Sequence, residues 1–173
     1  MKILIAYATR GGVTRTCAEM LAAPLFTHHN ITLISIDEQL LPEPSSYDAV
    51  VLGSSIRFGK TNKEIKKYIR RYASILSSMP CAVFLCCGFP LNFEEYIDTQ
   101  IPKELHCSLG FHSFGGELKP EKLKGLDKFI VKRVRNSIRF QDFEESDRDH
   151  HILPEIFMEN IRLLEEKIRQ IEK

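Results

Sequence analysis

The sequence has no tryptophan, no Cys-x-x-Cys spacing and no long apolar run. A membrane-spanning helix needs about 18 or more consecutive apolar residues, and disulfide scaffolds and zinc sites need regularly spaced cysteines. The five cysteines are an odd number, and only Cys86 and Cys87 are adjacent. This pattern is typical of buried, reduced thiols. With no signal-peptide pattern at the start, it predicts a cytoplasmic protein that is at most peripheral at the inner face of a membrane.

The chain also lacks a strong net charge, since its 24 Lys and Arg residues are balanced by 23 Asp and Glu residues, which gives a formal net charge of +1 at pH 7. With no nucleic-acid-reading motif, we expect no nucleic-acid binding. One basic helix is predicted over residues 122–139, which begin at Lys122 and end at Arg139. It is either the solvated face of a packed helix or a contact for a membrane surface or for acidic groups.

At 173 residues, with 43% hydrophobic and 27% charged residues, the chain is expected to form one domain over residues 1–173. Continuous apolar runs at residues 2–8, 49–53 and 81–87 are typical of strands buried on both faces of a parallel sheet. Residues 31–36, interrupted by Thr32 and Ser35, predict a strand nearer the sheet edge, and residues 111–115 a weaker fifth strand.

Three helices are predicted between and after these strands. The first begins near Thr14 and should end or kink at Pro24. The second covers residues 63–79, with Thr61 and Glu64 as a capping box. The third covers residues 153–171, with Pro154 in its first turn, and should pack across the sheet. Strands that alternate with helices predict a doubly wound α/β fold.

Three loops follow predicted strands at residues 9–14, 54–60 and 88–93. In the first, Gly11 and Gly12 allow close backbone approach, and the hydroxyls of Thr9 and Thr14 can donate to a phosphate at a helix N-terminus. The alternative is a simple capped strand-to-helix turn. The second loop is not a P-loop, because five residues rather than four separate Gly53 from the next glycine.

These loops resemble those of the flavodoxin superfamily, in which a T-x-x-G-x-T loop holds the phosphate of FMN. The segments ATRGGVTR (8–15), YDAVVLGSSIRFGK (47–60) and SFGGELKPEKLKGLDKFIVKRV (113–134) are similar to the menaquinone-dependent protoporphyrinogen oxidase branch. The S-x-I-R-[FY]-G segment at residues 54–59 is its more specific mark. The resemblance implies a flavodoxin-like, five-stranded parallel sheet of order 2-1-3-4-5, with helices on both faces and FMN bound noncovalently.

The same resemblance implies the residues that contact FMN. The phosphate would be held by Thr9, Arg10, Gly11, Gly12, Val13 and Thr14. One side of the ring would face Ser54, Ser55, Ile56, Arg57, Phe58 and Gly59, and the other would face Cys87, Gly88, Phe89 and Asn92. A positive charge such as that of Arg57 near the reduced ring would favour its anionic form and raise the potential.

The implied activity is that of an FMN-dependent oxidoreductase in haem biosynthesis, a quinone-linked protoporphyrinogen IX dehydrogenase with a small-molecule substrate and a quinone as partners. Where that branch carries a basic insertion, this chain has the acidic residues Glu94, Glu95 and Asp98. An electron-transfer shuttle that serves a redox protein partner therefore stays open, as does an interaction module without flavin. No metal site is predicted, because adjacent histidines such as His28 and His29 cannot both face one site.

Overall fold

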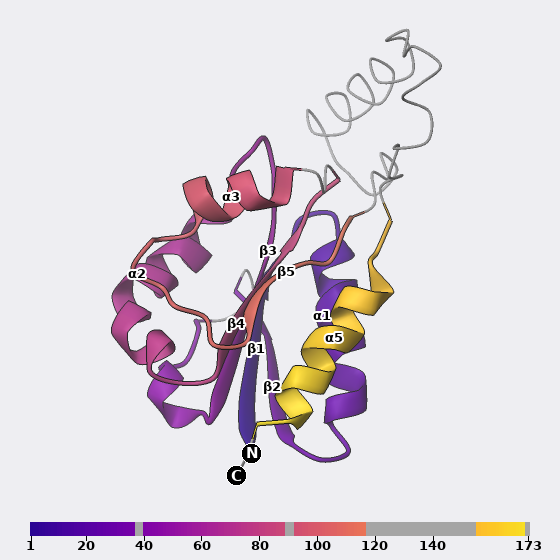
Figure 1. Cartoon of the computed structure of the whole chain (residues 1–173), viewed down its shortest axis with the longest axis vertical. Helices are drawn as coiled ribbons and strands as arrows, with labels where there is room; N and C mark the ends of the chain where they lie inside the picture. The colour runs from indigo at the N-terminus through magenta and orange to yellow at the C-terminus, as the bar shows by residue number, and fades with distance from the viewer. Residues whose placement is uncertain (37–39, 89–91, 117–154, 172–173) are drawn as a thin grey trace, which may run out of the picture.

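The computed structural model describes residues 1–36, 40–88, 92–116 and 155–171 (Figure 1). Its centre is a five-stranded parallel sheet of order β2-β1-β3-β4-β5. Helices α1 and α5 cover one face, and α2 and α3 cover the other. The predicted doubly wound fold and its strand order are confirmed.

The strands are β1 (Lys2–Ala8), β2 (Asn30–Ser35), β3 (Ala49–Ser55), β4 (Cys81–Cys86) and β5 (Gly110–Ser113). The three central ones are buried over nearly their whole length, as their continuous apolar runs predict. Strand β2 lies at the edge and is only partly buried, which confirms its predicted position. Strand β3 continues two residues beyond the predicted end, because Ser54 pairs with Ala8 and Ser55 with Cys86.

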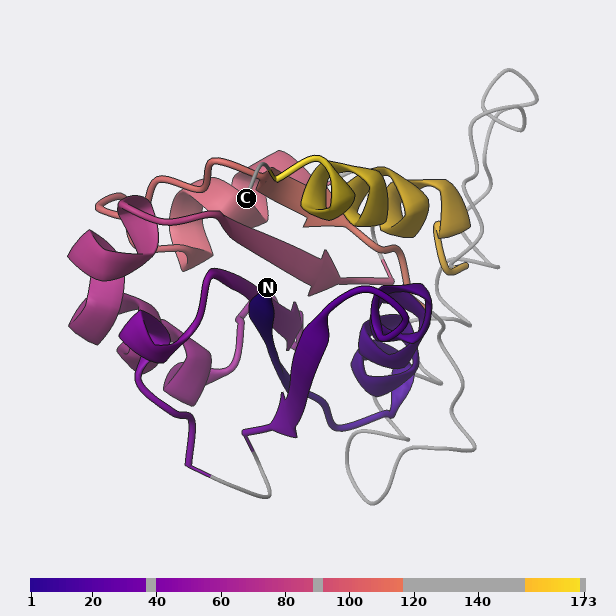
Figure 2. The same ribbon diagram turned by 90° about the horizontal axis from the view of Figure 1, so that it is seen from below.

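The helices are α1 (Val13–Leu25), α2 (Lys63–Ser77), α3 (Phe93–Gln100) and α5 (Met158–Arg169), with a short 3-10 turn, η1 (Pro44–Ser46). Helix α1 ends one residue after Pro24, close to the predicted stop. Helices α1 and α5 lie side by side, as the view from below shows (Figure 2). Within the described ranges, no helix is long and apolar enough to cross a membrane.

The core has one half on each side of the sheet, because successive residues of a strand point to opposite faces. Ile3 and Ile5 pack toward α1 and α5, whereas Leu4 and Ala6 pack toward α2. The Phe84 ring stacks on Phe114 with 4.4 Å between ring centroids. A Cβ on Gly53 would overlap the Phe84 ring, so this glycine makes room for the aromatic pair.

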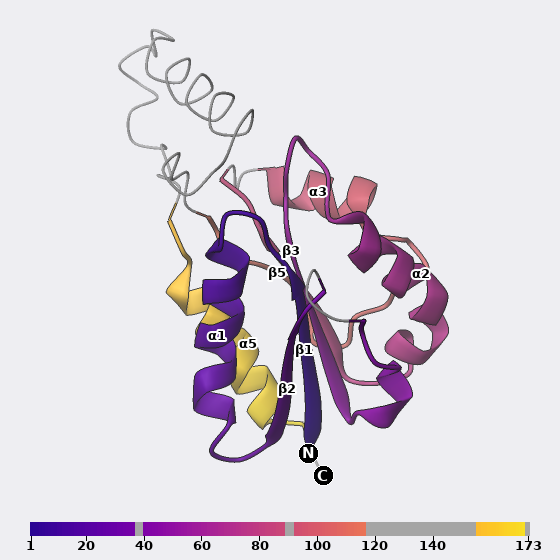
Figure 3. The same ribbon diagram turned by 180° about the vertical axis from the view of Figure 1, so that it is seen from behind.

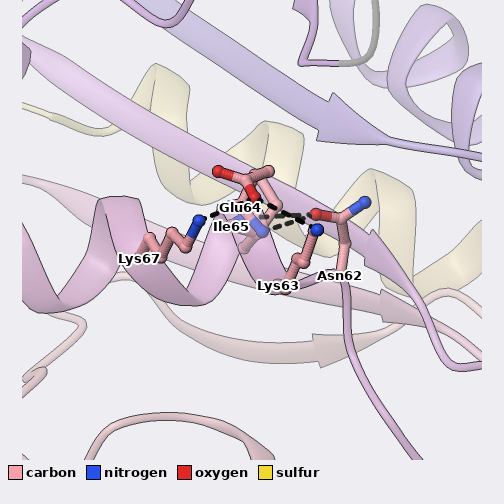
Figure 4. Close-up of polar contacts among 5 residues, drawn as sticks. All are labelled: Asn62, Lys63, Glu64, Ile65 and Lys67. Atoms are coloured by element: carbon pink, nitrogen blue, oxygen red, sulfur yellow. Dashed lines mark hydrogen bonds and ion pairs between the residues drawn. The ribbon is translucent and has the colours of Figure 1, made fainter.

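The capping box predicted at the start of α2 is wrong. Asn62 is the N-cap, and its Oδ1 accepts hydrogen bonds from the backbone N–H groups of Glu64 at 2.8 Å and Ile65 at 3.4 Å (Figure 4). Asn62 is an equally good capping residue, and the predicted start of the helix at Lys63 is confirmed. The hydroxyl of Thr61 is buried without a hydrogen-bond partner.

The start predicted for the last helix is also wrong, since α5 begins at Met158. The preceding residues extend the sheet instead: Gly115 forms an antiparallel bridge with Ile156, and Phe157 N–H donates to Phe114 O at 3.1 Å. Leu153 and Pro154 lie outside the described residues. Helix α3 is not among the three predicted helices, and Glu94 and Glu95 lie in its first turn.

Candidate functional site

The loops that follow β1, β3 and β4 leave the same edge of the sheet, opposite the N-terminus (Figure 1). Strand β1 lies between β2 and β3, so the chain leaves it on one side through α1 and returns on the other side into β3. Ligands of open α/β sheets bind at such a switch point, outside the carboxyl ends of the strands. The topology therefore brings two of the three predicted loops directly together at β1 and β3.

The first loop forms an open cradle at the start of α1. Gly12 has φ 86°, a left-handed conformation that disfavours side chains, and its N–H donates to Thr9 Oγ1 at 3.1 Å. No side chain caps the helix, and the N–H groups of Val13 and Thr14 have no acceptor within it. The positive end of the helix dipole lies at the same place. This cradle suits an anion.

Thr14 supplies the most specific sign of a ligand site. Its side chain is 1% exposed, and its Oγ1 has no oxygen or nitrogen hydrogen-bond partner. Its neighbour is the Cys86 thiol, and the interaction with the Thr14 hydroxyl lowers the pKa of Cys86, but sulfur is a weak hydrogen-bonding group. A buried, unpartnered hydroxyl costs about 1–3 kcal/mol. A phosphate oxygen would give this group the partner that the protein does not provide.

The second loop, after β3, is held in shape from both ends. Ser54 Oγ accepts a hydrogen bond from Asn62 N–H at 3.0 Å. Arg57 and Lys60 exchange two backbone hydrogen bonds, at 2.9 and 3.0 Å. These hydrogen bonds give the loop a defined conformation.

The tip of this loop is a tight turn with a strained aromatic residue. Phe58 and Gly59 both have positive φ, 49° and 72°, as in a type I′ turn. For a residue such as Phe this conformation costs about 1–2 kcal/mol. Phe58 is nevertheless 57% exposed, with the Arg57 guanidinium 4.8 Å from its ring centroid. Strain of this kind at an exposed aromatic is typical of ligand-contacting loops.

The third loop begins at Cys87, whose N–H donates to Gly115 O at 2.7 Å. A Cβ on Gly116 would come within 2.8 Å of the Cys87 carbonyl, so the chain after β5 packs tightly beneath this loop. Of the residues predicted to contact FMN in this loop, Gly88 follows Cys87 directly, and Phe89 lies outside the described residues. Asn92 immediately precedes α3, and its Nδ2 donates a hydrogen bond to Glu95 Oε2 at 3.2 Å.

Buried thiols line the inner side of the site. A hydrogen bond with Cys17 and burial raise the pKa of the Cys86 thiol well above its usual range. Burial, together with the neighbouring Cys87, also raises the pKa of the Tyr96 hydroxyl. These groups are uncharged at neutral pH. Among the described residues of the first two loops, positive charge near a ligand comes from Arg10, Arg57, Lys60 and the helix end.

Thr61, predicted from the sequence as a helix cap, is a further candidate site residue. Its hydroxyl is a second buried group without a partner, and it lies directly after the loop that leaves β3. The signal available in the sequence was a hydroxyl next to Gly59 and Lys60. Among the described residues, no group of three or more His, Cys, Asp or Glu side chains could hold a metal ion.

Comparison with known proteins identifies a family. The model of the flavodoxin domain family matches residues 4–144. The chain is 36% identical over 86 residues to protoporphyrinogen IX dehydrogenase [quinone] of Escherichia coli K12, which covers 49% of this chain and 47% of that protein. A protein of the same name from Leishmania major is 31% identical over 85 residues, covering 48% and 37%. The match thus spans about half the length, or less, of these curated relatives.

Among solved structures, a short-chain flavodoxin associated with a non-canonical PDU bacterial microcompartment is similar. Its TM-score is 0.53 at 15% identity, over 80% of this chain and 97% of that one. At this identity the likeness shows the fold alone.

Proposed function

The chain belongs to the flavodoxin domain family, and on that premise we propose that it binds FMN noncovalently at the β1/β3 switch point. Flavodoxins bind FMN at this position of the sheet. The observation that carries the proposal is the buried Thr14 hydroxyl, which has no oxygen or nitrogen partner, in the first turn of a helix that begins after the left-handed Gly12. Thr9, Arg10, Gly11, Gly12, Val13 and Thr14 would hold the phosphate.

The flavin ring would lie between the second and third loops. Ser54, Ser55, Ile56, Arg57, Phe58 and Gly59 would border one side, and Cys87, Gly88, Phe89 and Asn92 the other. Bound FMN supplies hydride and electron transfer. The protein orients the ring through the fixed turn at Phe58, and the Arg57 guanidinium, held over that aromatic ring at 4.8 Å, contributes a positive charge. Replacing Arg57 with alanine should therefore lower the midpoint potentials, and Lys103→Ala, in the exposed turn after α3, is the matched control.

We further propose that the protein is a quinone-linked protoporphyrinogen IX dehydrogenase that acts in haem biosynthesis. This proposal is supported by the two relatives of that name, whose similarity covers about half of this chain. The partners would be a porphyrinogen substrate and a quinone acceptor. A cytoplasmic location, with peripheral membrane contact through residues 122–139, is part of the same proposal, although those residues lie outside the described part of the chain.

The test is an anaerobic experiment with the FMN-loaded protein. Mixing with protoporphyrinogen IX should bleach the flavin absorbance, and a water-soluble menaquinone analogue should restore it. Flavin that protoporphyrinogen leaves oxidised would refute the dehydrogenase. Failure to take up FMN at all would refute the cofactor assignment as well.

An electron shuttle is the second candidate. It is favoured by Glu94 and Glu95, which are exposed in the first turn of α3, directly after the third loop. Acidic groups there would give a surface for a redox protein. Reduction of the flavin by a flavodoxin reductase but not by protoporphyrinogen would support the shuttle over the enzyme.

A further inference from the structure

The sequence that follows the predicted flavin loop carries a concentrated positive charge. Residues 57–71 contain seven Lys and Arg residues and a single carboxylate, that of Glu64, for a net charge of +6 in a chain whose total is +1. The loop after β3 and the first half of α2 hold all of them (Figure 3). We call Lys60, Lys63, Lys66, Lys67 and Arg70 the α2 basic surface.

These cations share one side of the helix. Residues spaced by three or four positions lie on one face, which places Lys63, Lys67 and Arg70 in a row. The opposite face, with Ile65 and Ile69, is buried against the sheet. The side chains of Lys63 and Lys67 are 85% and 69% exposed. The row therefore faces away from the protein.

Among the described residues, the charge of this surface is only slightly compensated. Glu64 lies between Lys63 and Lys67, at 4.0 and 3.0 Å from their ammonium nitrogens (Figure 4). Lys66 Nζ donates to the neutral Gln100 Oε1 at 2.7 Å. Burial, followed by the repulsion of Arg70 and Lys60, lowers the pKa of Lys66. An anionic surface facing this row would relieve that repulsion.

We propose that the α2 basic surface docks the protein on an anionic lipid bilayer. The role of this docking rests on the proposed function, because the quinone acceptor of the proposed dehydrogenase is dissolved in the bilayer and has to reach the flavin from there. Clusters of four to eight cations on a helix bind anionic lipids. Interfaces with proteins favour arginine and are depleted in lysine, whereas four of these five cations are lysines. Docking here would bring the turn at Phe58, just before α2, close to the membrane.

The test is co-sedimentation of the full chain, loaded with FMN, with two kinds of vesicle. One is pure phosphatidylcholine, and the other contains 30% phosphatidylglycerol as the anionic lipid. The protein should sediment with the anionic vesicles only, and 0.5 M NaCl should release it, because screening shortens the range of the attraction. Wild-type protein that binds neither vesicle, or both equally, would overturn the proposal.

A charge-removal variant locates the surface. Lys63→Gln, Lys67→Gln and Arg70→Gln combined should weaken vesicle binding by about 100-fold, since each cation near an anionic membrane contributes roughly a fivefold gain. The control is Lys2→Gln, Lys103→Gln and Arg162→Gln, which removes the same charge from exposed positions elsewhere. Equal binding by the two triple variants would overturn the assignment to α2 and would leave the contact proposed for residues 122–139 as the membrane contact.

A second readout separates this inference from the proposed function. The α2 triple variant should keep wild-type turnover with a water-soluble quinone analogue and lose most of its turnover with a quinone embedded in anionic vesicles. If the protein binds anionic vesicles but does not oxidise protoporphyrinogen, the docking surface is supported and only the proposed dehydrogenase activity is refuted. A wild-type protein that ignores vesicles but needs an acidic carrier protein for turnover would replace the lipid with a protein partner.

Discussion

Replacing Thr14 with valine exchanges one hydroxyl for a methyl group and keeps the shape of the side chain. Thr and Val have similar helix propensities, so the change acts on the hydroxyl alone. In the absence of FMN that hydroxyl is buried beside a thiol and without an oxygen or nitrogen partner, at a cost of about 1–3 kcal/mol. Thr14→Val should therefore raise the free energy of unfolding of the FMN-free protein by about 1 kcal/mol, or the melting temperature by about 2–4 °C for a chain of this size.

The same substitution should weaken FMN binding. A hydroxyl that donates to a phosphate makes a charge-assisted hydrogen bond, and the loss of such a bond costs about 1.5–3 kcal/mol. This corresponds to a rise in the Kd for FMN of about 10- to 100-fold. Greater stability without the ligand and lower affinity for it is the combination expected of a binding residue, whereas a structural residue would lose stability.

Both quantities are measured on the same preparations. Circular dichroism follows thermal unfolding without FMN, and quenching of flavin fluorescence reports the Kd. Thr16→Val is the matched control on the same helix, because the Thr16 hydroxyl already has a partner, Gly12 O at 3.2 Å. It should lose up to about 1 kcal/mol of stability and keep the FMN affinity. A Thr14→Val protein that melts lower and binds FMN as tightly as wild type would refute the role of Thr14.

Three further outcomes follow from the packing, the capping and the titration of the described residues. Gly53→Ala should cost about 1–3 kcal/mol in urea unfolding through overpacking against Phe84, and Phe84→Leu should recover part of it; an equal loss in both backgrounds would contradict the clash. Asn62→Ala should lower the free energy of unfolding by about 1 kcal/mol, whereas Thr61→Val should remove no capping hydrogen bond and leave that free energy unchanged. A larger loss of stability in Thr61→Val than in Asn62→Ala would show that Thr61 is the capping residue. The hydrogen bond with Cys17 and burial raise the pKa of Cys86 in the folded state. The Cys86 thiol therefore loses its proton at a lower pH in the unfolded protein than in the folded one, and high pH favours unfolding. The melting temperature should stay constant below about pH 8 and fall above about pH 9. Cys86→Ala should reduce that fall, and a melting temperature that rises with pH would exclude this account.

The sheet could be predicted from sequence because its signals are local. A strand buried on both faces is apolar at every position, and residues 3–8 and 81–87 have this pattern. The edge strand was recognisable by the polar interruptions at Thr32 and Ser35. The order of the strands came from family resemblance, since apolar runs do not say which strand lies next to which.

Two predictions were wrong, the start of the last helix and the residue that caps α2. In the first a long-range contact decides the structure, and in the second two adjacent residues are both suitable caps. Residues before Met158 look helical by spacing, but the pairing of Gly115 with Ile156 takes them into an extension of the sheet. Thr61 and Asn62 are both good caps, and the bond from Asn62 N–H to Ser54 Oγ, made across the loop, places the helix start at the second of them. Neither contact has a local signature in the sequence.

Three departures from local structural rules lie together at the candidate site, although α3 and α5 also begin without a side-chain cap and Ser113 in β5 also buries a hydroxyl without a partner. Helix α1 begins without a side-chain cap, Thr14 buries a hydroxyl without a partner, and Phe58 adopts a left-handed conformation that a glycine would adopt without cost. Each break costs stability, and in a sequence selected for folding alone nothing would maintain them. All three lie at the carboxyl ends of β1 and β3, the two strands that flank the switch point. A single anionic, planar ligand would remove the cost of the first two and contact the third, which is why their common position, more than any one of them, argues for a flavin phosphate in the cradle and its ring beside the turn.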